Sequence, residues 1–303
     1  MSSETKVYEQ PSIGERLYQR WDWATSVYGR LDLSAKVSFW IVLALVVIAI
    51  LAPEIAPYEP AQEHYDRSLV GPSLQHPLGT DLTGRDILSR MIYGARISLF
   101  VGISAVTIAM AIGIPIGSIA GYVGGWTDEV LMRAMDILIS FPALVIALAL
   151  VGTLGASLQN VILVIGVVYS PQYARLIRGE VLSVKEEEYV EAARNTGLSN
   201  TKIVTKHVIP NSMAPVLVQA TFHVATAILF EASLSFLGLG IQPPTATWGV
   251  MIADGRNYLP SEWWISTFPG IAIMIVVLAF NLLGDGLRDE FDPRDETQGG
   301  PNT

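Results

Sequence analysis

One stretch of 31 residues contains no Asp, Glu, Lys or Arg: Ile97-Ser-Leu-Phe-Val-Gly-Ile-Ser-Ala-Val-Thr-Ile-Ala-Met-Ala-Ile-Gly-Ile-Pro-Ile-Gly-Ser-Ile-Ala-Gly-Tyr-Val-Gly-Gly-Trp-Thr127. Two further stretches, Ile137–Ala174 and Trp263–Gly284, also lack these four residue types. A helix needs about 20 apolar residues to cross a bilayer, and it does so because its backbone polar groups are satisfied within the segment. The sequence therefore predicts an all-α polytopic membrane protein.

Composition supports this class and excludes others. Hydrophobic residues make up 51% of the 303 residues and charged residues only 16%, whereas soluble domains carry about 25% charged residues. Cysteine is absent, which excludes disulfides, thiolate metal sites and a cysteine nucleophile. The net charge of −9 argues against nucleic acid as a partner.

Six membrane-spanning helices are expected. The charge-free stretch Ile137–Ala174 is too long for one helix, and the turn-like residues Gly152–Ser157 divide it. The predicted spans are 37–52, 97–122, 137–151, 158–174, 213–237 and 267–283.

Basic residues predict the orientation of these spans. With six spans both termini lie on one side, and 14 of the 19 Lys and Arg residues fall on that side. Because basic residues are enriched in cytoplasmic loops, both termini are predicted to be cytoplasmic. Residues 1–35 form a cytoplasmic segment with amphipathic character, residues 36–287 the transmembrane domain, and residues 288–303 a cytoplasmic tail.

One cytoplasmic loop, residues 179–212, has local signals for structure. Strong helix formers cover Glu187–Thr196, and Gly197 stands where a glycine commonly ends a helix. Ser199 or Asn200 can cap a second short helix, and Pro210 begins the next span. Such a helix–glycine–helix elbow would make a stiff lever for a soluble partner, although an ordinary solvated helical hairpin has the same spacing.

Five sets of residues in order along the chain carry a family resemblance. They are His76–Arg90 with Gly94 and Arg96–Leu99, Gly124–Asp128 with Met132-Arg133 and Asp136, Glu191-Ala192-Ala193 with Gly197 and Val208-Ile209-Pro210-Asn211, Ser235–Gly240 with Pro243-Pro244 and Trp248-Gly249, and Asn281–Asp289 with Asp292-Pro-Arg294. The set in the elbow resembles the EAA loop of ATP-binding-cassette importer permeases, and the other four resemble the C-type subunit of dipeptide, oligopeptide and nickel importers. The resemblance spans about Ser34 to Arg294, and Val208-Ile209 is a small departure from the commoner Ile-Leu.

This resemblance implies the type I importer permease fold and a place in the cell membrane among lipids. The implied partners are a homologous second permease, two ATPase subunits that bind ATP and Mg²⁺, and an extracytoplasmic binding protein that delivers peptide. The chain itself would hold no cofactor and catalyse no reaction, and it lacks the P-loop motif that cradles ATP phosphates. The implied ATPase-coupling residues are Glu191, Ala192, Ala193, Gly197 and Pro210.

Two alternatives to peptide import remain open from the sequence. The same machine could import nickel or another small solute, and a secondary transporter would work without an ATPase. A secondary transporter has no need of the elbow.

Several polar and small residues outside the elbow are candidates for the pathway or the gate. Glu231 lies inside a span, where it either lines the pathway or forms a structural link. Asp81, Arg85 and Asp86 form a compact outer run, which suits charge pairing at an external gate or a docking face better than a metal site. Gly113, Gly117 and Gly121 recur at the small-xxx-small spacing of closely packed helices, and Trp248, Tyr258, Trp263 and Trp264 suit an interfacial aromatic belt.

Overall fold

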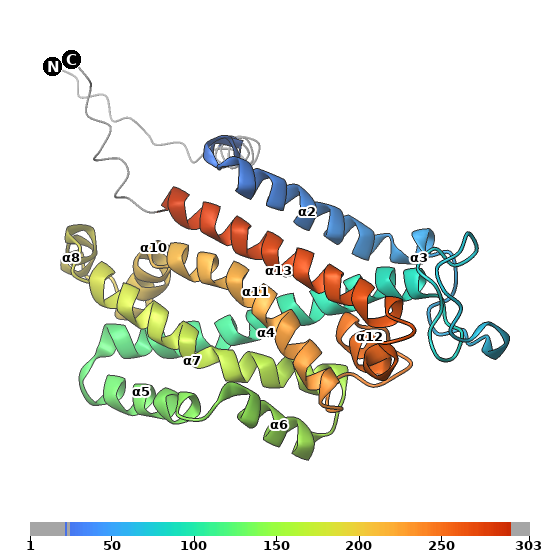
Figure 1. Cartoon of the computed structure of the whole chain (residues 1–303). Coiled ribbons are helices and arrows are strands. Elements are labelled where there is room, and N and C mark those ends of the chain that lie inside the picture. Colours follow the sequence, from blue (N-terminus) through green and yellow to red (C-terminus); the bar gives the residue numbers. More distant parts are fainter. Residues whose placement is uncertain (1–21, 23–24, 292–303) are drawn as a thin grey trace.

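A computed structural model of the chain describes residue 22 and residues 25–291, and these residues form a bundle of long helices (Figure 1). Five helices are long and apolar enough to cross a membrane, and a bent pair supplies a sixth crossing if its two arms count as one. The five are α2 (Leu33–Ile50), α4 (Ile87–Val123), α7 (Leu158–Val184), α11 (Met213–Phe236) and α13 (Trp264–Phe291). The predicted all-α membrane class is confirmed.

The predicted third span is wrong in shape. In place of one straight helix over 137–151, the structure has α5 (Gly125–Ile139) and α6 (Ala143–Leu154), which meet at an angle of 86°. Pro142 is the cause, since its backbone is extended (φ −55°, ψ 128°) and it has no N–H to continue the helix. Two arginines of α7 hold α5: Arg178 makes a bidentate pair with Asp128 at 2.5 Å, and Arg175 donates to Asp136 at 2.6 Å.

Helix α4 begins ten residues earlier than predicted and extends the second span into the segment that precedes it. The Asp86 carboxylate caps its first turn by accepting from the Ser89 N–H at 2.8 Å. Arg90 lies in this first part of the helix yet is only 1% exposed. Arg90, which the sequence placed in the segment before the span, is therefore part of the helix and buried against Asp81 and Asp254.

The most extensive helix contact joins α4 and α7, and three glycines of α4 make it possible. A Cβ atom built on Gly113, Gly117 or Gly121 would lie 2.1–2.9 Å from the nearest backbone atom of α7. These distances are too short for any side chain. The spacing of small residues thus serves close helix packing.

Helices α2 and α13 lie side by side and bring the start of α2 and the end of α13 together (Figure 1). The Asp32 carboxylate caps α2 by accepting from the Ala35 N–H at 2.9 Å. Arg30 forms an ion pair with Glu290 near the end of α13. Residues 25–30 are helical, whereas most of the predicted amphipathic segment lies outside the described residues.

Short helices occupy the two ends of the bundle. At one end the elbow contains α8 (Glu188–Asn195), α9 (Asn200–Ile203), the π-helical turn η2 (Val204–Val208) and α10 (Ile209–Asn211). At the other end lie α3 (Ala52–Ile55), η1 (Tyr65–Arg67), α12 (Trp248–Gly255) and η3 (Arg256–Tyr258).

Candidate functional site

The elbow contains the two short helices and the glycine turn expected from its sequence. Helix α8 ends at Asn195, and Gly197 follows with φ +79°, a conformation that favours glycine. A Cβ built on Gly197 would meet no atom of the described chain within 4 Å. Backbone conformation, not lack of space, therefore explains this glycine. Ser199 is the N-cap residue of α9, without a side-chain cap bond.

Helix α8 has one inner and one outer face. Val190 and Ala193 are buried and join the core with Ile203. Glu191 and Ala192 are exposed, as is Gly197. The two predicted alanines thus differ, because Ala193 packs inside the elbow and only Ala192 offers its methyl group to another molecule.

Two hydrogen bonds and the path of the chain tie the elbow to the spans beneath it. The Lys185 ammonium, at the end of α7, donates to the Gly121 carbonyl at 2.9 Å, and the Tyr122 hydroxyl donates to Asn200 Oδ1 at 3.1 Å. The first bond joins the end of α7 to the end of α4, and the second joins α9 of the elbow to the end of α4. On the far side Pro210 lies in α10, which leads directly into α11. The elbow is therefore built on α4, α7 and α11 together.

At the opposite end of the bundle, the predicted outer run is a buried network of charges. Asp81 Oδ2 accepts from Arg85 Nε at 2.7 Å and lies 3.5 Å from Arg90 Nε. The guanidinium groups of both arginines also lie 3.7 Å from Asp254 Oδ2 in α12. The pairing joins the loop that precedes α4 with α4 itself and α12.

Asp86 belongs to a separate pair within this network. Its Oδ1 lies 2.9 Å from His76 Nδ1, and its Oδ2 accepts from the Ser89 hydroxyl at 2.7 Å. Asp81 and Asp86 are thus engaged with different partners. Among residue 22 and residues 25–291, no cluster of three His, Asp or Glu side chains could hold a metal ion.

Two tryptophans that the sequence assigned to an interfacial belt instead fasten this end of the bundle. Trp248 is 1% exposed and its indole N–H donates to the Met91 carbonyl at 3.1 Å, so its assignment to an interfacial belt is wrong. The Trp264 indole donates to the Thr80 carbonyl at 3.2 Å, whereas Trp263 is 49% exposed. The partners lie more than 150 residues away in the sequence, which is why spacing alone gave no signal.

Glu231 is fully buried in α11 and bridges to α12. Its Oε1 accepts from the Ser235 hydroxyl at 2.8 Å and from the Thr247 hydroxyl at 3.0 Å. Thr247 in turn caps α12 by accepting from the Val250 N–H at 3.1 Å. Gly249 lets the two helices approach, since a Cβ there would lie 2.5 Å from Ala232 Cα. The arrangement has the form of a structural link.

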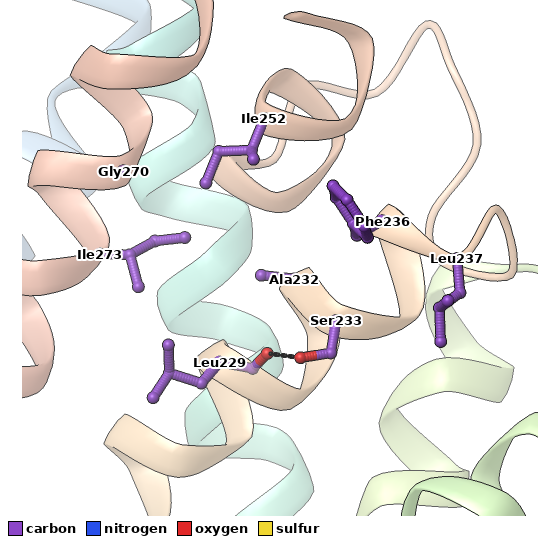
Figure 2. Close-up of a pocket in the computed structure, with 8 residues that line it drawn as sticks. All are labelled: Leu229, Ala232, Ser233, Phe236, Leu237, Ile252, Gly270 and Ile273. Carbon is purple, nitrogen blue, oxygen red and sulfur yellow. Dashed lines mark hydrogen bonds between the residues drawn. The ribbon is translucent and has the colours of Figure 1, made fainter. Parts of the chain in front are cut away.

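An apolar groove of about 390 Å³ lies between α11, α12 and α13 (Figure 2). Its lining is almost entirely hydrocarbon, and the hydroxyl of Ser233 is occupied by the Leu229 carbonyl at 2.8 Å. The lining residues are Leu229, Ala232, Ser233, Phe236, Leu237, Ile252, Gly270 and Ile273. Nothing in this groove would hold a charged solute.

Residues 113–295 match a family described as the binding-protein-dependent transport system inner membrane component, and residues 34–77 match the N-terminal transmembrane domain of oligopeptide transport permease C. A dipeptide transport system permease of Alkalihalophilus pseudofirmus is 46% identical over 86% of this chain and 86% of its own. A di/tripeptide transport system permease of Pseudomonas aeruginosa is 44% identical over 83% of this chain and 85% of its own. A glutathione transport system permease of Escherichia coli is 45% identical over 84% of each chain.

A solved structure shares the fold. One chain of the inward-facing MetNI methionine ABC transporter aligns with this chain at a TM-score of 0.55 and 18% sequence identity. The aligned region covers 67% of this chain and 97% of the MetNI chain.

Proposed function

Because this chain belongs to the family of binding-protein-dependent transport system inner membrane components, we propose that it is the permease that forms half of the pore of an ATP-driven importer for di- and oligopeptides. The observation that carries the proposal is the elbow, an exposed helix with a glycine turn that is hydrogen-bonded to α4 and continuous in the chain with α7 and α11. Peptides are the substrate class because the dipeptide and di/tripeptide permeases are its relatives over most of its length.

The partners follow from this role. A homologous second permease completes the pore, two ATPases bind ATP and Mg²⁺, and a binding protein delivers peptide on the outer side. The chain itself is non-catalytic and holds no cofactor. Both termini are cytoplasmic, on the side of the elbow.

Coupling begins at the exposed face of α8. The small side chain of Ala192 lets this face seat closely against an ATPase subunit. When the ATPases close, Glu191, Ala192 and the Gly197 turn therefore move with them. The bonds of Lys185 and Tyr122 carry this motion to the end of α4. Since α4 and α7 are packed backbone to backbone at their glycines, they move as one body. The result is a shift between inward- and outward-open packings.

The outer charge network belongs to the external gate. Asp81 and Arg85 hold the outer loop against α4 and α12, and Asp86 fixes the first turn of α4. Glu231 anchors the other end of α12 through Thr247. Helix α12 thus follows α4 and α11 when the spans move.

Replacement of Gly197 tests the coupling role. Valine at this position is strained at φ +79° and deforms the turn without a clash. We expect the reconstituted complex with Gly197→Val to lose peptide uptake and the ATP turnover stimulated by binding protein. Gly155→Val is the matched control, since Gly155 has φ +90° and equally open surroundings but lies at the other end of α7. Equal coupling in the two variants would refute the proposal.

A further inference from the structure

A second pocket, of about 500 Å³, lies at the outer end of the bundle between the end of α11 and α12. It shares Phe236 and Leu237 with the apolar groove of Figure 2 but differs in having charged walls. Its volume lies within the range of small-molecule sites. Its polar lining residues are Ser235, Gln242, Asp254 and Arg256, and its apolar ones include Ile241, Pro243 and Val250.

Asp254 is the unusual group of this pocket. Its side chain is only 29% exposed, yet it accepts no hydrogen bond from the described residues. Its nearest cations, on Arg85 and Arg90, lie 3.7 Å away, which is ion-pair contact but too long for a hydrogen bond. The carboxylate is thus only partly enclosed, and it lines the pocket. Its hydrogen-bond acceptor capacity remains open on that side.

The two arginines behind Asp254 do not compete for a ligand. Arg90 is 1% exposed and Arg85 7% exposed, and both are shared with Asp81. They hold the carboxylate in place and leave its open side to the pocket. Burial raises the pKa of Asp254, while Arg90 and Arg85 oppose that rise.

The other polar groups of the pocket are also partly used. Gln242 donates its amide N–H to the Gly240 carbonyl at 3.0 Å, so its amide oxygen is free to accept. Arg256 donates to the Phe236 carbonyl at 2.8 Å and stacks over the Phe236 ring. It is exposed at the rim and keeps other N–H donors. Inside the pocket the free groups are acceptors, and one of them is ionic.

We propose that this pocket is a subsite for the free ammonium terminus of a short peptide, with Asp254 as its counter-ion. An ammonium group has three donors and no acceptor, which suits the free oxygens of Asp254 and Gln242. Ile241 and Val250 provide apolar wall for the first side chain, and Arg256 at the rim suits the opposite carboxylate. This assignment rests on the proposed peptide import. It adds the place in the pore that receives the amino terminus of the peptide.

The absence of native cysteine makes a direct test possible in the assembled complex without binding protein. Ala253, which lines the pocket, is replaced by Cys and labelled with methanethiosulfonate reagents that carry either a trimethylammonium or a sulfonate group. Leu74→Cys is the control, because Leu74 is fully exposed on an outer loop away from the pocket. Labelling is repeated with millimolar dialanine and with N-acetyl-dialanine, which lacks the ammonium group.

We expect the cationic reagent to modify Cys at position 253 about five- to tenfold faster than the anionic one, relative to position 74. Asp254→Asn abolishes the preference and Asp254→Glu keeps it. Dialanine slows labelling at 253 only, and N-acetyl-dialanine does not. Equal rates for the two reagents, or equal protection by the two peptides, would overturn the subsite. Uptake of dialanine by the unmodified complex is measured separately, so that a failure of peptide import is distinguished from a failure of the subsite.

Discussion

Replacement of Glu231 separates a structural link from a pathway residue. Oε1 of this carboxylate accepts two hydrogen bonds in a fully buried site, from Ser235 and Thr247. Glu231→Leu has a similar volume but removes both bonds. Ser235 can turn its hydroxyl to a backbone carbonyl one turn earlier. Thr247 has no such escape, because its oxygen must still accept from the Val250 N–H that it caps.

The magnitude follows from these bonds. Each lost bond costs about 0.5–1.5 kcal/mol and a stranded buried donor about 1–3 kcal/mol, so Glu231→Leu destabilises the chain by about 2–4 kcal/mol. Glu231→Gln keeps an acceptor for both hydroxyls and costs about 1 kcal/mol or less.

The assay is heat-induced loss of the monodisperse complex in detergent, together with peptide uptake in vesicles. Glu231→Leu lowers the midpoint by roughly 5–10 °C, while Glu231→Gln lies near the unmodified protein and retains uptake. Two results would refute the reasoning. One is equal destabilisation by the two variants, which would mean that the hydrogen bonds do not matter. The other is a stable Glu231→Gln complex without uptake, which would make the carboxylate part of the pathway.

Three further predictions concern packing, ion pairing and titration. Gly117→Ala forces α4 and α7 apart and destabilises the complex by about 1–3 kcal/mol. The control Gly179→Ala, in open surroundings on α7, is neutral or stabilising in the same thermal assay, and similar losses of stability in both variants would refute the packing account. Asp128→Arg and Arg178→Asp each loosen α5 from α7, and the variant that carries both substitutions recovers part of the lost thermal stability. If the stability losses of the two single variants simply add in the double variant, direct pairing of the two side chains is contradicted. Burial raises the pKa of Asp254 against the opposing pull of Arg90 and Arg85, with Asp81 adding to the rise. The charge preference of labelling in its pocket should therefore be lost, on acidification, at a higher pH than the ordinary pKa of an aspartate, about 3.9; a preference that persists down to that ordinary value would contradict the raised pKa.

Local signals account for what the sequence predicted well. Helix α8 and the turn at Gly197 depend on neighbouring residues, so helix formers and one glycine sufficed to place them. The membrane spans are predictable for a similar reason, because the length of a charge-free stretch can be measured from neighbouring residues alone. The bend at Pro142 is also a local signal, but within the charge-free stretch the glycine-rich turn at 152–157 marks a helix end more strongly than a single proline does.

The outer network shows why other features were not predictable. Arg90 marked a loop in the sequence because a single charge is costly inside a helix bundle. The structure buries it between Asp81 and Asp254, which are more than 170 residues apart. The packing of Trp248 likewise depends on Met91. One sequence gives the residue types of such a network but not which distant members meet.

The most direct test of the account is a proximity measurement on the exposed face of α8. Ala192→Cys, carrying a short photo-crosslinker in the otherwise cysteine-free chain, is illuminated in the assembled complex, with Ala193→Cys as the buried control and Leu74→Cys as the outer-face control. We expect efficient crosslinks from position 192 to an ATPase subunit, weak ones from position 193 and none from position 74. An ATPase that crosslinks to none of these positions, or as readily to 74 as to 192, would contradict the account.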